Sequence, residues 1–145
     1  MKYLLRLTSH FLIAVLCTYI LASFAHSQFV LAELSAVGID IDLANRLSMS
    51  IDDLLGLFPI YSTAIALSLV IGFGSVGLIR KFRPKSTAML YPLGGFVALF
   101  VMLLAMQPIL GITIIAGARS YFGIFCQCLA GGIGGGVFMG LATKN

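Results

Sequence analysis

Four long apolar segments constrain the fold of this chain more than any other feature. They cover residues 8–28, 59–79, 87–106 and 120–143, and none of them contains Asp, Glu, Lys or Arg. A helix of about 20 apolar residues spans the hydrocarbon core of a bilayer. Charged residues make up only 10% of the chain, against about 25% in typical soluble domains. The sequence therefore predicts an all-α integral membrane protein, a four-helix bundle of four transmembrane helices forming one domain over residues 1–145.

The charged residues divide by sign along the chain. All five acidic residues lie between residues 33 and 53, whereas lysine and arginine concentrate near both ends and in the 80–86 connection. Basic residues are retained on the cytoplasmic side of a membrane. We therefore expect both termini and the 80–86 loop inside, and the 29–58 loop outside. A basic patch between two apolar segments indicates contact with membrane lipid headgroups, and not with nucleic acid.

The first 28 residues also fit a secretory signal peptide. Basic residues precede an apolar run there, and Ser23-Phe24-Ala25 resembles a weak cleavage site. The apolar run continues through Leu31, which gives it the length of a full span and favours a retained helix.

The outer loop 29–58 contains a helical pattern of its own. Its apolar residues recur at intervals of three and four, which is typical of one face of a helix. These residues are Leu43, Leu47, Ile51, Leu54 and Leu55. We predict a short amphipathic helix there, lying on the membrane surface.

The third apolar segment contains residues that disturb a helix. Pro92, followed by two glycines, predicts a kink. Gln107-Pro108 predicts the end of the segment. Residues 107–118 are then either an apolar connection or a shallow re-entrant piece.

Glycines gather in the fourth segment. In lipid, small residues let helix backbones approach closely, and the GxxxG spacing is a known pattern for such contacts. Three overlapping GxxxG pairs form two adjacent rows, made by Gly131, Gly132, Gly135, Gly136 and Gly140. The second segment offers a complementary row of small residues that includes Ser68 and Gly72. We expect the second and fourth segments to pack closely within one chain, with a homodimer formed groove to groove as the alternative.

Two polar residues of the last third need partners. Arg119 at the membrane edge is costly unless it pairs or reaches the headgroups, so it is expected either to hold lipid phosphates or to pair with Asp52 or Asp53. Gln127 lies deeper in the segment, where a glutamine usually bonds a neighbouring helix. The alternative is that Gln127 lines a polar pathway.

Catalytic and cofactor chemistry find no support in the sequence. His10 and His26 are separated by about 24 Å on one helix, so they cannot share a haem iron or another metal within one chain. The three cysteines lie in apolar segments and are expected to fill space. We therefore expect no enzyme activity, no catalytic residues, no cofactor and no metal.

The stretch Gly117-Ala118-Arg119, followed by Gln127, Ala130-Gly131 and Gly134-Gly135, resembles the end of small uncharacterised four-span bacterial inner-membrane proteins. The resemblance implies a bacterial inner-membrane location and no known activity. The expected function is that of a non-enzymatic partner-binding or accessory subunit that uses glycine-mediated helix packing. The alternative is a small transporter or channel for a neutral or lipid-like solute, with the Pro92 kink as its moving part.

Overall fold

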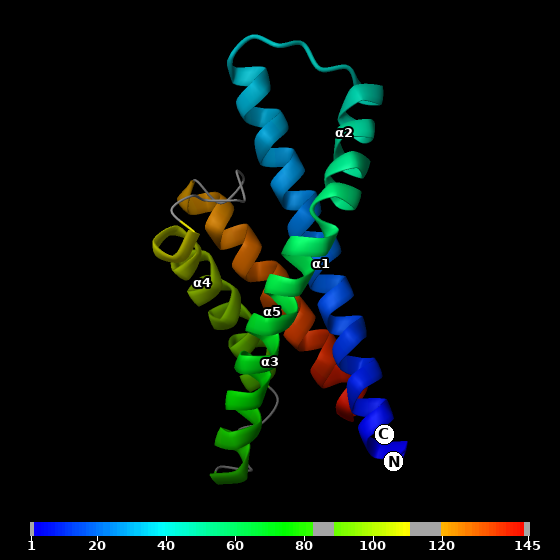
Figure 1. Cartoon of the computed structure of the whole chain (residues 1–145), viewed down its shortest axis with the longest axis vertical. Helices are drawn as coiled ribbons and strands as arrows, with labels where there is room; N and C mark the ends of the chain where they lie inside the picture. Colours follow the sequence, from blue (N-terminus) through cyan, green and yellow to red (C-terminus); the bar gives the residue numbers. More distant parts are fainter. Residues whose placement is uncertain (1, 83–88, 111–119, 144–145) are drawn as a thin grey trace.

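A computed structural model describes residues 2–82, 89–110 and 120–143, and Figure 1 shows the course of the chain. Within these ranges the secondary structure is entirely helical. The five helices are α1 (Lys2–Ala36), α2 (Leu43–Gly56), α3 (Phe58–Phe82), α4 (Leu90–Leu110) and α5 (Tyr121–Thr143). The prediction of an all-α chain is confirmed.

Three of these helices are long and apolar enough to cross a membrane. Their apolar parts are Leu4–Ala36, Phe58–Phe82 and Tyr121–Ala142, and α4 contributes a shorter apolar helix, Leu90–Met106. This set matches the first, second and fourth apolar segments of the sequence, whereas the third forms a helix of lesser apolar length.

The first helix is longer than predicted. It has 35 residues, or about 52 Å at a rise of about 1.5 Å per residue, and so exceeds the hydrocarbon core of about 30 Å. The helix continues past residue 28, where the predicted span ended, and the first glycine after that point is Gly38. Gly38 has a φ of 87°, and its amide donates to the carbonyl of Ser35 at 3.1 Å. A left-handed glycine of this kind ends helices without the steric cost that a side chain would bring.

The predicted amphipathic helix exists as α2. Its N-cap is Asp42, whose carboxylate accepts a hydrogen bond from the Leu43 amide at 2.8 Å. Only Leu57 separates α2 from α3, and helical bonding continues across it, since the Leu57 amide donates to Asp53 and the Tyr61 amide donates to Leu57. Figure 1 shows α2 and α3 as one bent rod that crosses α1. α2 continues the direction of α3 and packs on α1. Its position on the membrane surface stays a prediction.

The predicted kink and end of the third segment were both wrong. The Leu93 amide donates to the carbonyl of Met89 at 3.2 Å, so helical bonding starts there and Pro92 lies in the first turn of α4. Proline costs no intrahelical hydrogen bond in a first turn. The helix also continues past Pro108 to Leu110. The rest of the 107–118 piece lies outside the described residues.

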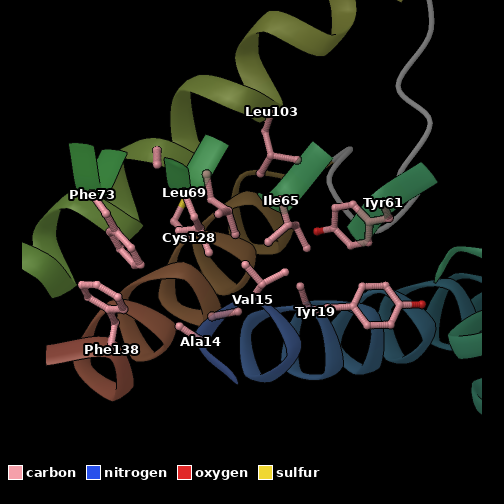
Figure 2. Close-up of a cluster of buried hydrophobic side chains, with 14 of the residues drawn as sticks. Ala14, Val15, Tyr19, Tyr61, Ile65, Leu69, Phe73, Leu103, Cys128 and Phe138 are labelled. Atoms are coloured by element: carbon pink, nitrogen blue, oxygen red, sulfur yellow. The ribbon is translucent and has the colours of Figure 1, made fainter. Parts of the chain in front are cut away.

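The helices share one apolar core. α5 packs against α4 and α1, and α3 packs against α4 and α1. Figure 2 shows part of the core, with side chains from α1, α3, α4 and α5 pointing toward one another: Ala14, Val15, Tyr19, Tyr61, Ile65, Leu69, Phe73, Leu103, Cys128 and Phe138. Cys128 is buried among them as a small apolar group.

Candidate functional site

The closest helix contact is a glycine seam between α4 and α5, made by Gly95, Gly131 and Gly135. A Cβ atom built on Gly131 would lie 2.5 Å from the carbonyl oxygen of Gly95. One built on Gly135 would lie 2.6 Å from the carbonyl carbon of Tyr91. These atoms belong to the backbone and cannot turn aside, so the seam admits no side chain. Glycine therefore lets the two backbones meet directly, as expected for helix association in lipid.

The partner of these glycines differs from the predicted one. They contact α4, whereas the second apolar segment, now α3, was expected to receive them. Gly72 of that segment does pack closely, but its Cβ position lies 2.8 Å from Ala98 on α4. Ser68 is half-buried, and its hydroxyl donates to the Ile65 carbonyl of its own helix at 2.8 Å. α3 approaches α5 through long side chains instead, for example the stacked rings of Phe73 and Phe138 at 4.8 Å.

A second contact of α5 uses Gly134 on the side facing α1. A Cβ atom there would lie 3.1 Å from the Ala14 carbonyl oxygen and would overlap the hydroxyl of Thr18. The Thr18 hydroxyl is the end of a side chain and can rotate, so this contact is less strict than the glycine seam.

We therefore expect Gly134→Ala to be moderately destabilising, by about 1 kcal/mol. Combining it with Thr18→Ala should recover about half of that loss, because the double variant removes the overlapping hydroxyl. Unfolding of the single and double variants in mixed micelles, followed by circular dichroism, measures both values. An equal loss in the two variants would contradict the assignment of the clash to Thr18.

The remaining glycine row of α5 borders an open groove. A Cβ atom on Gly132 would lie 3.5 Å from the Pro92 carbonyl oxygen, and one on Gly136 would lie 3.9 Å from the Pro92 ring. Both positions are ordinary contacts with room to spare, and a Cβ built on Gly140 meets no atom within 4 Å. The groove has a volume of about 470 Å³. It is lined by Met89, Pro92, Leu93, Phe96, Leu129, Gly132 and Ile133.

Gln127 joins three helices in the interior. Its side chain is fully buried. Its amide nitrogen donates to the Ala22 carbonyl on α1 at 3.0 Å, and its oxygen accepts from the Tyr61 hydroxyl on α3 at 2.6 Å. Both polar atoms of the amide are thus bonded within the chain.

Several hydrogen bonds between polar groups also link α1 to α2. The Tyr19 hydroxyl donates to the Leu54 carbonyl. The Ser27 hydroxyl donates to the Asp53 carboxylate at 2.8 Å. His26 is buried on the same stretch of α1. These contacts fix α2 beside α1.

The predicted ion pair stays a prediction. Asp53 is half-buried and held by Ser27, whereas Asp52 is exposed. Arg119 lies outside the described residues.

The sequence patterns did not predict which residues bond to Gln127, or that α4 packs against the glycines of α5. Gly95 was taken as part of a kink after Pro92, and no specific partner was predicted for Gln127. One available signal was the spacing of small and polar residues on α1. Residues Ala14, Thr18, Ala22 and His26 recur every four positions, as do Val15, Tyr19, Ser23 and Ser27. All eight are buried, so this pattern marks the inward face of an otherwise uniformly apolar helix.

In the part of the chain that the structure describes, no three residues among His, Cys, Asp and Glu gather to hold a metal. No family model matches the chain, and comparisons with curated proteins and with solved structures return no significant match. The resemblance of the last third to small bacterial inner-membrane proteins stays a prediction.

Proposed function

We propose that this chain is a non-enzymatic, four-span protein of the bacterial inner membrane that binds another integral membrane protein. The binding site is the groove between α4 and α5. The observation that carries the proposal is that Gly132 leaves bare backbone in the lining of an apolar groove, with Gly136 one turn further along α5 beside the Pro92 ring. Helices in lipid associate where small residues allow close backbone approach.

The charge pattern supports the proposed orientation, with both termini inside. Arg6 lies near the start of α1, and Arg80 and Lys81 lie at the end of α3. In Figure 1 these two ends lie at the same side of the molecule as the end of α5. The acidic residues lie toward the opposite side, on the end of α1, in the connection after it and on α2. Retention of basic residues in the cytoplasm then places α2 outside.

A helix fits the groove better than a lipid chain does. A flexible acyl chain fills any apolar hollow and gains little from missing side chains. The carbonyl and Cα groups exposed at Gly132 and Gly136 make close, directional contacts with another backbone. The occupant is therefore an apolar transmembrane helix that carries small residues at its own contact positions.

The transporter alternative draws less support. Its polar element, Gln127, has both amide atoms bonded to Ala22 and Tyr61. Its moving element, a kink at Pro92, is absent because Pro92 lies in the first turn of α4.

The test is extraction from membranes in a mild detergent, followed by intact-complex mass measurement. We expect a reproducible complex that Gly132→Ile and Gly136→Ile abolish, because the added side chain occupies the groove. Gly77→Ile is the matched control, since Gly77 is an exposed glycine on α3 where a Cβ meets no atom within 4 Å. The control should retain the complex.

Three outcomes would overturn the proposal. One is a monomer in several mild detergents. Another is a complex that both groove variants leave intact. The last is a cross-chain disulfide at Gly132→Cys in a chain without its native cysteines, which would assign the groove to a second copy.

A further inference from the structure

The end of α1 and the whole of α2 form an arm that we call the acidic arm, residues 29–57. Figure 1 shows it extending past the ends of α4 and α5. The arm carries all five acidic residues of the chain and one basic residue, Arg46, so its net charge is −4. The rest of the chain has eight basic residues and no acidic ones. The arm is therefore a region of opposite charge at one end of the molecule.

The side of α2 that packs on α1 carries polar residues as well as Leu54, which packs against the core. Arg46 donates to the Ser35 hydroxyl at 3.3 Å, and Gln28 donates to the Ser50 hydroxyl at 3.4 Å. Together with the Asp53 contact, these bonds take up the side of α2 that packs on α1.

The apolar side of α2 faces outward. Leu47 and Leu55 are 65% and 70% exposed. Leu43 and Ile51 continue the same stripe at four-residue spacing, and Val37 and Ile39 are exposed in the preceding connection. Exposed acids border this stripe, namely Asp40, Asp42 and Asp52. An exposed apolar stripe rimmed by charged residues is typical of a surface that interacts with another protein or with a membrane.

The membrane surface is a poor occupant for this stripe. Helices that lie on bilayers carry lysine and arginine beside their apolar face and are attracted to anionic lipids. Here the one arginine, Arg46, is turned toward α1, and the charges that remain beside the stripe are acidic. Anionic headgroups would repel them.

A second copy of the chain is a poor occupant too. The basic residues Arg6, Arg80 and Lys81 lie at the far end of the molecule. Two copies with the same orientation in a membrane would bring acidic arm against acidic arm, and like charges in contact oppose association.

We propose that the acidic arm docks a cationic amphipathic helix of a protein partner on the outer side of the membrane. Apolar residues of the partner cover Leu47, Ile51 and Leu55, and its lysines or arginines meet Asp52 and the neighbouring acids. In this mode of recognition the apolar faces of two amphipathic helices pack together, and the flanking charges are complementary. The surface is separate from the groove between α4 and α5, so this inference does not depend on that groove being occupied.

The test uses a synthetic amphipathic helix of leucine and lysine as the probe. The full chain is placed in nanodiscs of zwitterionic phosphatidylcholine, and binding to empty nanodiscs is subtracted. We expect the lysine probe to bind at least about tenfold more tightly than the same helix with glutamate in place of lysine. Added salt should weaken the binding, because part of it is electrostatic.

Two variants and one control locate the site. Leu47→Ser combined with Leu55→Ser should weaken binding by about tenfold or more, and Asp52→Lys by about fivefold. Leu67→Ser is the matched control, because Leu67 is a comparably exposed leucine on α3, within an apolar span. Gel filtration and circular dichroism establish that each variant keeps its fold.

Other results would overturn the proposal. Equal binding of the two probes, or no loss in the arm variants, removes the basis for a cationic partner. Quenching of a fluorophore attached at Leu47→Cys by brominated lipids would assign the stripe to the bilayer. Self-association of the chain that Leu47→Ser abolishes would assign it to a second copy.

Discussion

Replacing Gly135 with alanine is expected to lower the free energy of unfolding by about 3 kcal/mol. A single methyl group at this position would lie 2.6 Å from the Tyr91 carbonyl carbon and 2.9 Å from the Cα of Pro92. Both atoms belong to the backbone of α4, which can move away only as a whole helix. The methyl group therefore separates α4 from α5 along the seam and disturbs the core on both sides.

The neighbouring row provides the control for this prediction. Gly132→Ala adds the same methyl group to the same helix, but its nearest contact is the Pro92 carbonyl oxygen at 3.5 Å. We expect a change within about 0.5 kcal/mol. Unfolding in mixed micelles, followed by circular dichroism, measures both variants. If Gly135→Ala does not accumulate, the cellular abundance of the two variants gives the same comparison. Similar stability or abundance for the pair would show that the seam is not as close as described.

Replacing Gln127 with leucine is the second large change that we expect, with a loss of about 2 kcal/mol. The substitution leaves the buried Tyr61 hydroxyl without its acceptor, and it removes the second hydrogen bond that the Ala22 carbonyl accepts in addition to the one within its helix. Unpaired polar groups are costly where neither water nor another donor can replace the lost bond. Leucine also lacks the planar amide that fits between the three helices.

A double-mutant cycle separates the hydrogen bond from the change of shape. Tyr61→Phe removes the donor, so combining it with Gln127→Leu should cost less than the sum of the two single changes. The coupling should fall between about 0.6 and 1.7 kcal/mol, the average and the maximum measured for side-chain hydrogen bonds between membrane helices. Ser75→Ala is a suitable control, because Ser75 is exposed and its hydroxyl bonds only within α3. Additive effects of Tyr61 and Gln127 would contradict a direct bond.

The helical class and the positions of the apolar helices were predictable because apolar length is a strong and local signal. The core of each apolar segment became a helix, and the amphipathic pattern at Leu43 to Leu55 became α2. The boundaries were less predictable. The sequence contains Gly38, which can end a helix. The first span was nevertheless predicted to end at Gln28, where the residues become more polar. Pro92 was misjudged because the effect of proline depends on where a helix starts.

Helix pairing was not predictable from composition alone. Rows of small residues occur on α3, α4 and α5, and any two of these rows could pack against each other. Gly72 and Gly131 both satisfy the rule for close approach, but each meets α4 and not the other. The choice depends on how Tyr61, Phe73 and other large side chains of α3 fill the space in front of α5. That is a property of the whole bundle and cannot be obtained from one row of glycines.

The glycine seam also has an entropic consequence. A leucine or isoleucine that becomes fixed in a helix contact loses about 0.5 to 1 kcal/mol of rotamer freedom. Gly95, Gly131 and Gly135 have no side-chain rotamers, so these residues lose no side-chain entropy when α4 packs against α5. The attraction between them comes from dispersion, because lipid supplies no hydrophobic drive. The weak attraction between the two helices is therefore opposed by little loss of side-chain entropy, which helps the short helix α4 to hold its place beside α5.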